Sequence, residues 1–116
     1  MLFRSKGQAT LRVTITGAAG VLGTQVLRQL EGRSDVRIRL TYLLDPAAPP
    51  AQEFLRAALS DPQQALEAVE GSDVVIHCAA IHPWKAYTDA QYLDCNVKGT
   101  YFLLKACCDA DRKSVV

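Results

Sequence analysis

Three evenly spaced glycines mark the segment of the sequence with the clearest chemical potential. Gly17, Gly20 and Gly23 follow a short apolar run at residues 13–16 and precede a segment whose apolar residues recur at helical spacing. A strand, a glycine turn and a helix in this order direct backbone N–H groups and the positive end of the helix toward one point. Phosphate binds at such a point, so we expect the pyrophosphate of a dinucleotide here.

The spacing G-x-x-G-x-x-G is one residue wider in its first gap than the common dinucleotide fingerprint. Each glycine still has a physical role. Gly17 permits a tight turn, Gly20 lets the backbone approach a phosphate, and Gly23 lets the helix pack closely on the strand. A glycine-rich turn that binds no ligand is the alternative, and the flanking strand and amphipathic helix favour the cofactor site.

Asp45 is the second candidate. It is expected at the end of the second strand, about twenty residues after the last glycine. A carboxylate there accepts hydrogen bonds from the adenosine ribose hydroxyls and repels a 2′-phosphate, so the expected cofactor is NAD, with NADP less favoured. The alternative is a turn-forming aspartate before Pro46.

The elements that position these residues alternate between strand and helix. Strands are expected at residues 13–16, 36–44 and 73–77, with a short one at 53–59, whose composition also suits a helix, and the start of a fifth at 113–116. Helices are expected from residue 19 or 20 to 30, from Asp61-Pro62 to Gly71, and from 89 to 110. Asp61 is expected to cap its helix, with Gln64 reaching back in a capping box.

This order predicts an α/β fold with a Rossmann-like, doubly wound parallel sheet that is incomplete at its carboxy-terminal edge. Its ligand should lie at the carboxyl ends of the strands, next to the glycine turn. Residues 11–116 are expected to form this one domain, and residues 1–10 a flexible tail.

Apolar spacing also predicts which helix residues face inward. In the helix after Asp61 these are Leu66 and Val69. An inward Asn96 requires hydrogen-bond partners, because an unpaired buried amide is unfavourable. Gly99 is expected to let the long helix pack closely on a neighbour. The inward stripe of the long helix is predicted to be Leu93, Asn96 or Val97, Thr100, Leu103 or Leu104, and Cys107.

Composition excludes several classes of function. The chain has 116 residues, a net charge of +1 and no basic run, so nucleic acid is not an expected partner. No apolar run is long enough for a secretory signal or a membrane span. The four cysteines form no C-x-x-C pair, so reduced thiols in the cytoplasm are expected. No metal site is expected, because no common zinc spacing is formed by His77, Cys78, His82 and Cys95.

Three segments, TGAAGVLG, DVVIHCAA and NVKGT, together resemble the extended short-chain dehydrogenase/reductase superfamily in its NAD-dependent epimerase/dehydratase branch, including its 3-beta-hydroxysteroid-dehydrogenase-like members. The resemblance extends from residue 11 to 116 and implies an oxidoreductase that transfers hydride between a nicotinamide and a carbinol carbon. It implies that Asn96 supports the active site. The cofactor-binding residues that it implies are Gly17, Ala18, Gly20, Val21, Leu22 and Gly23 at the pyrophosphate, with Cys78, Ala79 and Ala80 beside the nucleosides.

Two departures from the family pattern affect the expected function. Ala58 stands where relatives carry an acid for the adenine, so only backbone groups near Leu59 are expected to serve. The family's catalytic Ser/Thr and Y-x-x-x-K lie beyond the fifth strand, where this chain stops, so the chain alone is expected to be inactive. Tyr101 and Lys105 reproduce the spacing within the long helix, where a catalytic role is not expected.

These departures leave two alternatives to the cofactor half of an enzyme: a non-catalytic dinucleotide-binding regulatory module, and a truncated product without independent activity. A small-molecule substrate is expected only if a carboxy-terminal half is present. Incomplete cover of the sheet edge predicts self-association. The loop residues His82, Trp84 and Tyr87 either line a pocket or cover the sheet end.

Overall fold

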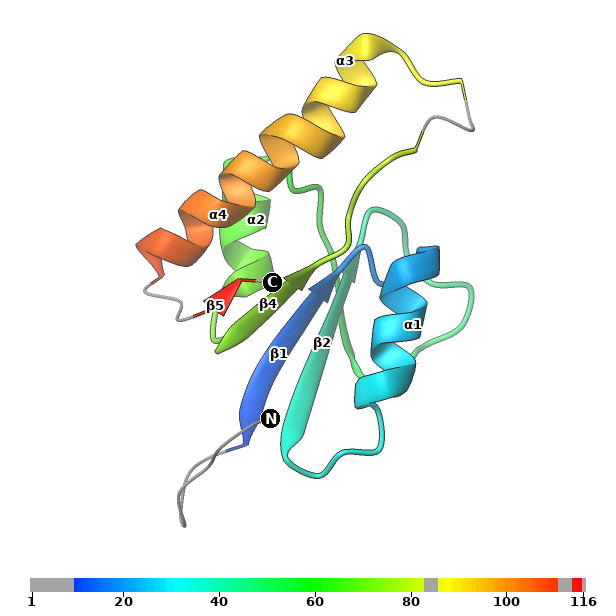
Figure 1. Ribbon diagram of the computed structural model, residues 1–116, viewed down its shortest axis with the longest axis vertical. Coiled ribbons are helices and arrows are strands. Elements are labelled where there is room, and N and C mark those ends of the chain that lie inside the picture. Colours follow the sequence, from blue (N-terminus) through cyan, green and yellow to red (C-terminus); the bar gives the residue numbers. More distant parts are fainter. Residues whose placement is uncertain (1–9, 83–85, 111–113, 116) are drawn as a thin grey trace.

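A parallel five-stranded sheet lies at the centre of the computed structural model, which describes residues 10–82, 86–110 and 114–115 (Figure 1). The strand order is β3-β2-β1-β4-β5. The strands are β1 (Leu11–Thr16), β2 (Val36–Tyr42), β3 (Glu53–Arg56), β4 (Val74–His77) and β5 (Ser114–Val115). The helices are α1 (Val21–Leu30), α2 (Pro62–Val69), α3 (Asp89–Tyr92), the π-helical η1 (Leu93–Lys98) and α4 (Gly99–Asp109).

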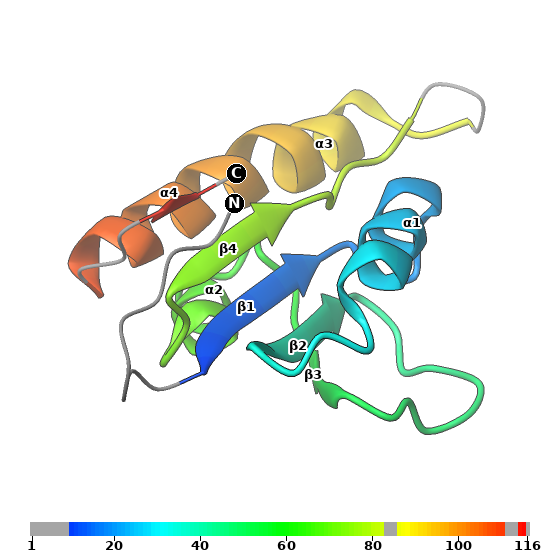
Figure 2. The ribbon, with the colours of Figure 1, turned by 60° about the horizontal axis from the view of Figure 1, so that its bottom comes forward.

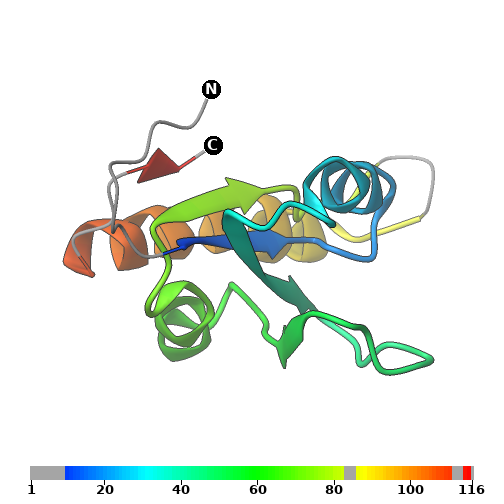
Figure 3. The ribbon, with the colours of Figure 1, turned by 90° about the horizontal axis from the view of Figure 1, so that it is seen from below.

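Helices cover both faces of the sheet, which confirms the predicted doubly wound α/β architecture. In Figure 3, α1 and α2 lie on opposite sides of the strands. The apolar core on the α1 face is built from Val13, Ile15, Ile38 and Leu40, against which Val26, Leu27 and Leu30 of α1 pack. On the other face, α2 and α4 pack over β4 through Ala65, Ala68, Val69, Val75, Leu103, Ala106 and Cys107.

The strand order reverses at β1, which has β2 on one side and β4 on the other. β1 and β4 end level with one another, because Thr16 is in register with His77, and β2 continues one residue past Thr41, which is the partner of Thr16. Ligands of doubly wound sheets bind at the carboxyl ends of the strands beside such a reversal. Gly17 and Cys78 are the first residues beyond β1 and β4, so both lie at this point.

Two strand boundaries differ from the sequence prediction. The strand expected at residues 36–44 ends at Tyr42, and Leu43 and Leu44 are exposed. The segment expected at 53–59 is a strand rather than a helix, but it ends at Arg56, because it pairs with β2 only from Glu53 to that residue. The predicted residues Lys113 and Val116 of the fifth strand, and the tail at 1–9, lie outside the described residues.

Helix α2 begins as its local sequence predicts. The Asp61 carboxylate accepts hydrogen bonds from the N–H groups of Gln63 (2.9 Å) and Gln64 (3.3 Å), and Pro62 occupies the first helical position. Gln64 does reach back to Asp61, since its Nε2 donates to the Asp61 carboxylate (3.3 Å). The bond that would complete the expected capping box is absent, because the Gln64 side-chain oxygen accepts from the Ala58 N–H (2.8 Å) and not from the Asp61 N–H. Leu66 was also wrongly assigned to the inward face: it is 37% exposed, while Ala65, Ala68 and Val69 are buried.

The long helix is continuous from α3 to α4 and runs beside β4 (Figure 2). Its middle, η1, is a π-helix. A π turn contains an extra residue, so residues on either side of it are rotated relative to an unbroken α-helix. The predicted inward position of Leu93 is therefore wrong, since this side chain is 54% exposed. Of the paired choices, Val97 and Leu104 are exposed, whereas Leu103 is buried and Asn96 is half-buried.

Gly99 begins α4 and packs against Leu59, as its position in the sequence predicts. A methyl group added at Gly99 would lie 3.5 Å from Leu59 Cβ and 3.5 Å from the Asp94 carbonyl oxygen, which are ordinary van der Waals separations. The contact is therefore close, but there is room for an alanine at this position.

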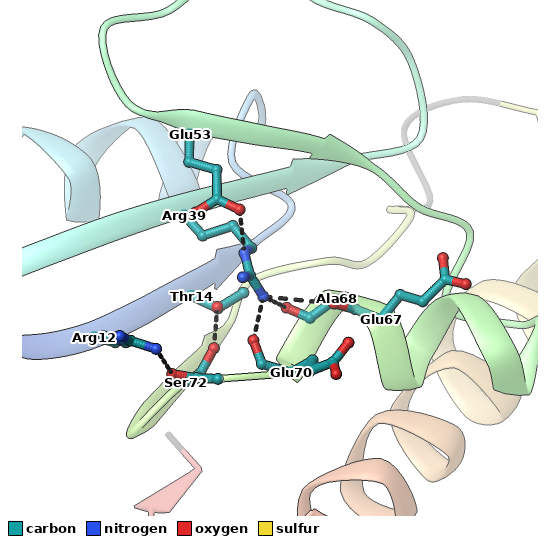
Figure 4. Close-up of polar contacts among 9 residues, drawn as sticks. Arg12, Thr14, Arg39, Glu53, Glu67, Ala68, Glu70 and Ser72 are labelled. Carbon is teal, nitrogen blue, oxygen red and sulfur yellow. Dashed lines mark hydrogen bonds and ion pairs between the residues drawn. The ribbon is translucent and has the colours of Figure 1, made fainter.

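Arg39 connects β2, β3 and the end of α2 (Figure 4). Its Nη1 donates to the carbonyl oxygens of Glu70 (2.7 Å) and Ala68 (3.1 Å), and its Nε donates to a carboxylate oxygen of Glu53 (2.9 Å). The last carbonyl groups of a helix have no intrahelical donor and carry partial negative charge. Because α2 has no basic residue in its own last turn, Arg39 supplies the missing donor and charge.

We predict that Arg39→Met lowers the free energy of unfolding by about 2 kcal/mol, because the α2 carbonyls and Glu53 lose a charged donor. Urea denaturation followed by circular dichroism measures the change. Arg37→Met is the matched control, since Arg37 is an exposed arginine of the same strand. Its effect should stay within about 0.5 kcal/mol. Equal losses in the two variants would contradict the role of Arg39.

Candidate functional site

The turn between β1 and α1 lies directly against the chain that leaves β4. Gly17 has a φ of 64°, in the left-handed region that favours glycine. A Cβ atom added to Gly17 would lie 2.6 Å from the backbone nitrogen of Ala79 and 2.7 Å from the carbonyl carbon of Cys78. Both the backbone conformation and the close approach of two backbones therefore require glycine here, which agrees with the predicted tight turn.

The other two glycines differ in their surroundings. A Cβ on Gly23 would collide with the Gly17 carbonyl oxygen, so the first turn of α1 packs on the glycine turn. The sequence predicts packing of Gly23 on the strand, and this expected neighbour is wrong. Gly20 is the N-cap of α1, and its added Cβ would meet only the Gly17 oxygen, at 3.3 Å. Gly20 is therefore less crowded than Gly17 and Gly23, although this one contact is tighter than an ordinary van der Waals separation.

The amino terminus of α1 has no partner within the described structure that would replace an anion. Gly20 offers no side-chain cap, and the first turn contains no acidic residue. Helix geometry leaves the N–H groups of Val21, Leu22 and Gly23 without intrahelical acceptors, and the side chains of Val21 and Leu22 are exposed. In contrast, Asp61 and Thr88 cap α2 and α3. The positive end of α1 is thus available to a phosphate.

The opposite side of the site is the segment that follows β4. Cys78 packs into the α1-side core, Ala79 packs into the other core, and Ala80 is exposed. The Thr16 hydroxyl oxygen accepts hydrogen bonds from the N–H groups of Cys78 (3.1 Å) and Ala79 (3.3 Å). Burial raises the pKa of the Cys78 thiol, so this cysteine remains protonated and is a poor nucleophile.

The next residue of that segment, Ile81, is hydrogen-bonded to the side chain of Asn96 on η1. Its Nδ2 donates to the carbonyl oxygen of Ile81 (2.9 Å), and its Oδ1 accepts from the N–H of Ile81 (2.8 Å). Both halves of the side-chain amide are therefore paired with one backbone unit. The prediction that Asn96 has specific partners is confirmed, and its partners lie immediately after Ala80.

The residues predicted for the adenosine lie on and beyond β2 and β3. Asp45 is three residues past the end of β2, exposed, with a carboxylate oxygen 3.6 Å from Nη1 of Arg56. Leu59 is buried, so only its backbone can meet a ligand. The neighbouring Ala58 N–H already donates to Gln64, as described above.

The remaining loop and helix candidates are placed as follows. His82 is exposed, and its carbonyl oxygen accepts a hydrogen bond from the hydroxyl of Tyr92 (3.4 Å). The rings of Tyr87 and Tyr92 pack edge to face, with their centroids 5.8 Å apart. Trp84 lies outside the described residues. The side chains of Tyr101 and Lys105 are exposed on α4, and Nζ of Lys105 lies 3.6 Å from a carboxylate oxygen of Asp109.

Several features are absent from the part of the chain that the structure describes. No three His, Cys, Asp or Glu side chains there gather closely enough to hold a metal ion. All four cysteines are described, and none forms a disulfide. None of the described helices has the length and apolar character needed to cross a membrane.

A pocket of about 190 Å³ lies at the amino edge of the sheet, away from the glycine turn. Arg12, Arg37 and Arg39 contribute to its lining, together with Glu53. Arg39 is already paired with Glu53 and with the carbonyl end of α2, whose partial charge disfavours an anion. The arrangement suited to a phosphate is therefore the one at the carboxyl edge.

The site also contains residues that the sequence did not single out. Thr16 and Thr100 are not among the residues predicted for the site, and His77 is named in the sequence analysis only with the residues that lack a zinc spacing. The three side chains nevertheless form one hydrogen-bonded chain beside the glycine turn. The available signal was a threonine in place of an aliphatic residue at the end of a buried strand, because a buried hydroxyl requires a partner.

Comparisons with known proteins agree with this geometry. The sequence model of the NAD dependent epimerase/dehydratase family matches residues 13–116. The chain is 32% identical over 97 residues to uronate dehydrogenase from Pseudomonas putida, covering 82% of this chain and 35% of that protein.

Solved structures show the same likeness. The crystal structure of uronate dehydrogenase from Agrobacterium tumefaciens is 31% identical, with a TM-score of 0.75 over 93% of this chain and 40% of that one. A variant of that enzyme was crystallised with NAD. MoeE5, in complex with UDP-glucuronic acid and NAD, is 25% identical, with a TM-score of 0.75 over 90% of this chain and 35% of that one. The chain thus spans 35–40% of the length of these relatives.

We predict that Gly17→Ala lowers the free energy of unfolding by at least about 3 kcal/mol, since its methyl group meets backbone atoms and its φ is positive. Gly32→Ala is the matched control: Gly32 has a φ of 87°, but an added Cβ has nothing within 4 Å. That variant should lose only about 1 kcal/mol. Thermal and urea denaturation measure both values, and similar losses would contradict the steric role of Gly17.

Proposed function

The chain belongs to the NAD dependent epimerase/dehydratase family, and from this premise we propose that it binds NAD at the carboxyl edge of its sheet as the cofactor half of an oxidoreductase. The observation that carries the proposal is the uncapped amino terminus of α1 behind the glycine turn. A Cβ added to Gly17 or Gly23 would collide with backbone atoms, whereas a Cβ added to Gly20 would meet one atom within 4 Å, the Gly17 carbonyl oxygen at 3.3 Å. This is the arrangement that a pyrophosphate requires.

We assign the contacts of the cofactor from the placement of these residues. The N–H groups at the start of α1 would hold the pyrophosphate, and the exposed Asp45 carboxylate would accept the adenosine ribose hydroxyls. Backbone groups at Leu59 would border the adenine. The segment of Cys78, Ala79 and Ala80 would border the nicotinamide riboside. When bound, NAD supplies the hydride acceptor.

The proposed reaction of the whole protein is hydride transfer at a carbinol or carbonyl carbon. The relatives that are named uronate dehydrogenases make a sugar acid the substrate class that we favour. Tyr101 and Lys105 do not serve as its acid–base pair, because they lie on the exposed side of α4 and Lys105 pairs with Asp109. We therefore propose that this part of the chain positions the cofactor, with Asn96 supporting the site, and that groups beyond the described residues move the proton.

A non-catalytic dinucleotide-binding module is the second candidate function. It is favoured by the same exposed positions of Tyr101 and Lys105, since the described residues bring no Ser/Thr–Tyr–Lys set to the carboxyl edge. Turnover of a uronate by a protein that contains this segment would exclude it.

We also propose that the chain works in the cytoplasm. None of its four cysteines, all in the described part, forms a disulfide. Burial raises the pKa of the thiols of Cys78 and Cys95, which keeps both in the less reactive protonated form. A reducing compartment is where such thiols persist.

Calorimetric titration with NAD tests the proposed function. We predict that Gly20→Asp raises the Kd for NAD by roughly 100-fold or more, because the new carboxylate occupies the place of a phosphate oxygen and repels it. Aspartate is a favourable N-cap, so the fold should persist in this variant. Gly32→Asp adds the same charge beyond the other end of α1 and should leave the Kd within about twofold. Unchanged binding in Gly20→Asp would overturn the phosphate site.

The same titration with NADP tests the role of Asp45. The wild type should bind NAD about tenfold more tightly than NADP, since the carboxylate repels a 2′-phosphate. Asp45→Asn should reduce this preference, because the amide removes the repulsion and leaves Arg56, 3.6 Å away in the wild type, to meet the phosphate. A preference that is unchanged in Asp45→Asn would place the ribose elsewhere.

We further propose that the isolated chain self-associates. One side of the long helix exposes Leu93, Val97, Tyr101 and Leu104, each by 47–60%. Sedimentation velocity should show dimers or larger species, and Val97→Lys should shift them toward monomer, because a charge in the apolar stripe opposes its burial. Leu44→Lys is the control, since Leu44 is 67% exposed and lies in the loop after β2, outside the long helix. A single sharp monomer for the wild type would contradict the proposal.

A further inference from the structure

A continuous chain of hydrogen bonds crosses the site from β1 through β4 to α4. The Thr16 hydroxyl lies 2.7 Å from Nδ1 of His77, and Nε2 of His77 lies 3.0 Å from the hydroxyl of Thr100. The Thr100 hydroxyl donates to the carbonyl oxygen of Asn96 (2.8 Å). One imidazole ring therefore joins the end of the strand that carries the glycine turn to the helix that carries Asn96.

The proton positions in this chain follow from counting donors and acceptors. The Thr16 oxygen already accepts from the N–H groups of Cys78 and Ala79, so its own proton is directed to Nδ1 of His77. Nδ1 is then an acceptor, and the neutral ring carries its proton on Nε2. The Nε2–H donates to the Thr100 hydroxyl oxygen, and the Thr100 hydroxyl proton is donated to the Asn96 carbonyl oxygen. Every group in the chain is satisfied by this single assignment.

We propose that His77 is a positioning residue, which in its neutral, Nε2-protonated form aligns the Thr16 hydroxyl and thereby holds the backbone of Cys78 and Ala79 against the glycine turn. Since an added Cβ at Gly17 would lie only 2.6 Å from the Ala79 nitrogen, the separation of these two segments decides the shape of the site. The effect of His77 on NAD affinity rests on the proposed function, but its effect on the backbone does not.

Among the residues that the structure describes, the groups hydrogen-bonded to the His77 ring are uncharged. On β1, η1 and α4 the groups that contact His77 directly are the hydroxyls of Thr16 and Thr100. Burial raises the pKa of the thiols of Cys78, the next residue along the chain, and of Cys95 on η1. The charged side chains of η1 and α4 pair with one another on exposed surface, as Asp94 with Lys98 and Lys105 with Asp109. Arg12 lies at the opposite end of β1.

Acid should therefore weaken this arrangement. Burial lowers the pKa of His77 below its ordinary value of about 6.5. As the pH falls below that value, the unfolded chain takes up a proton that the folded chain does not, so stability decreases until the pH reaches the folded pKa. Protonation of Nδ1 then places a donor against Thr16, whose oxygen must give up a backbone N–H to accept it.

The first experiment identifies the tautomer. Long-range ¹H–¹⁵N correlation of the labelled chain near neutral pH distinguishes the two neutral forms of an imidazole. The chain has two histidines, so His82→Gln leaves His77 as the single signal. We expect the Nε2-protonated form. A ring protonated on Nδ1, or a mixture of the two tautomers, would overturn the assignment.

The second experiment measures the effect on the backbone through a residue that lies between the ring and Asn96. Thr100→Val keeps the shape of the side chain but removes the acceptor for Nε2–H, whereas Thr100→Ser keeps the hydroxyl. We expect amide hydrogen exchange at Ala79 to accelerate about two- to tenfold in Thr100→Val and to return to the wild-type rate in Thr100→Ser. Thr88→Val, which removes the hydroxyl cap of α3, controls for a general loss of helix stability.

The Kd for NAD should follow the same pattern, rising about two- to tenfold in Thr100→Val only. Exchange at Ala79 that is unchanged in Thr100→Val, or equally changed in Thr88→Val, would overturn the positioning role. If the wild type does not bind NAD, the proposed function fails, and the tautomer and the Ala79 exchange rate still decide this inference.

Discussion

The absence of space for a side chain at Gly17 is the constraint on which the rest of the site depends. Two backbone segments, the turn after β1 and the segment after β4, lie so close that an added Cβ would be 2.6 Å from the Ala79 nitrogen. This contact makes the carboxyl ends of the two strands one continuous surface. It also places the start of α1 directly above that surface, because Gly23 rests on the carbonyl oxygen of Gly17.

Buried hydroxyl groups hold the central strands to their neighbours at both edges of the sheet. At the amino edge Thr14 bonds to Ser72, which precedes β4, and at the carboxyl edge Thr16 bonds to His77 and to the segment beyond it. These threonines are fully buried on the face of the sheet opposite α1. An aliphatic residue at position 16 would fill the same volume, but it would remove the hydroxyl acceptor of the Ala79 N–H, whereas the Cys78 N–H would keep the Thr16 backbone carbonyl as its acceptor (3.1 Å).

Helices α1 and α2 differ in how the polar groups at their termini are satisfied. Asp61 caps the start of α2, and Arg39 satisfies its end, so both termini of that helix are complete without a ligand. Helix α1 begins at Gly20 with no side-chain cap, so its first N–H groups have no side-chain acceptor. A helix start that forgoes a stabilising cap is typical of a binding site, where the ligand supplies the missing acceptors.

The local sequence determined the features that depend on near neighbours along the chain: the glycine turn at Gly17, the cap at Asp61, and the alternation of strand and helix from which the doubly wound sheet follows. Tertiary structure decided the rest. Pairing with the two neighbouring strands defines the end of β2, since its last pair with β1 is at Thr41 and its last pair with β3 is at Tyr42. The π turn in the long helix rotates Leu93 outward. The bonds of His77 join it to residues 61 and 23 positions away, so only the folded chain could bring these groups together.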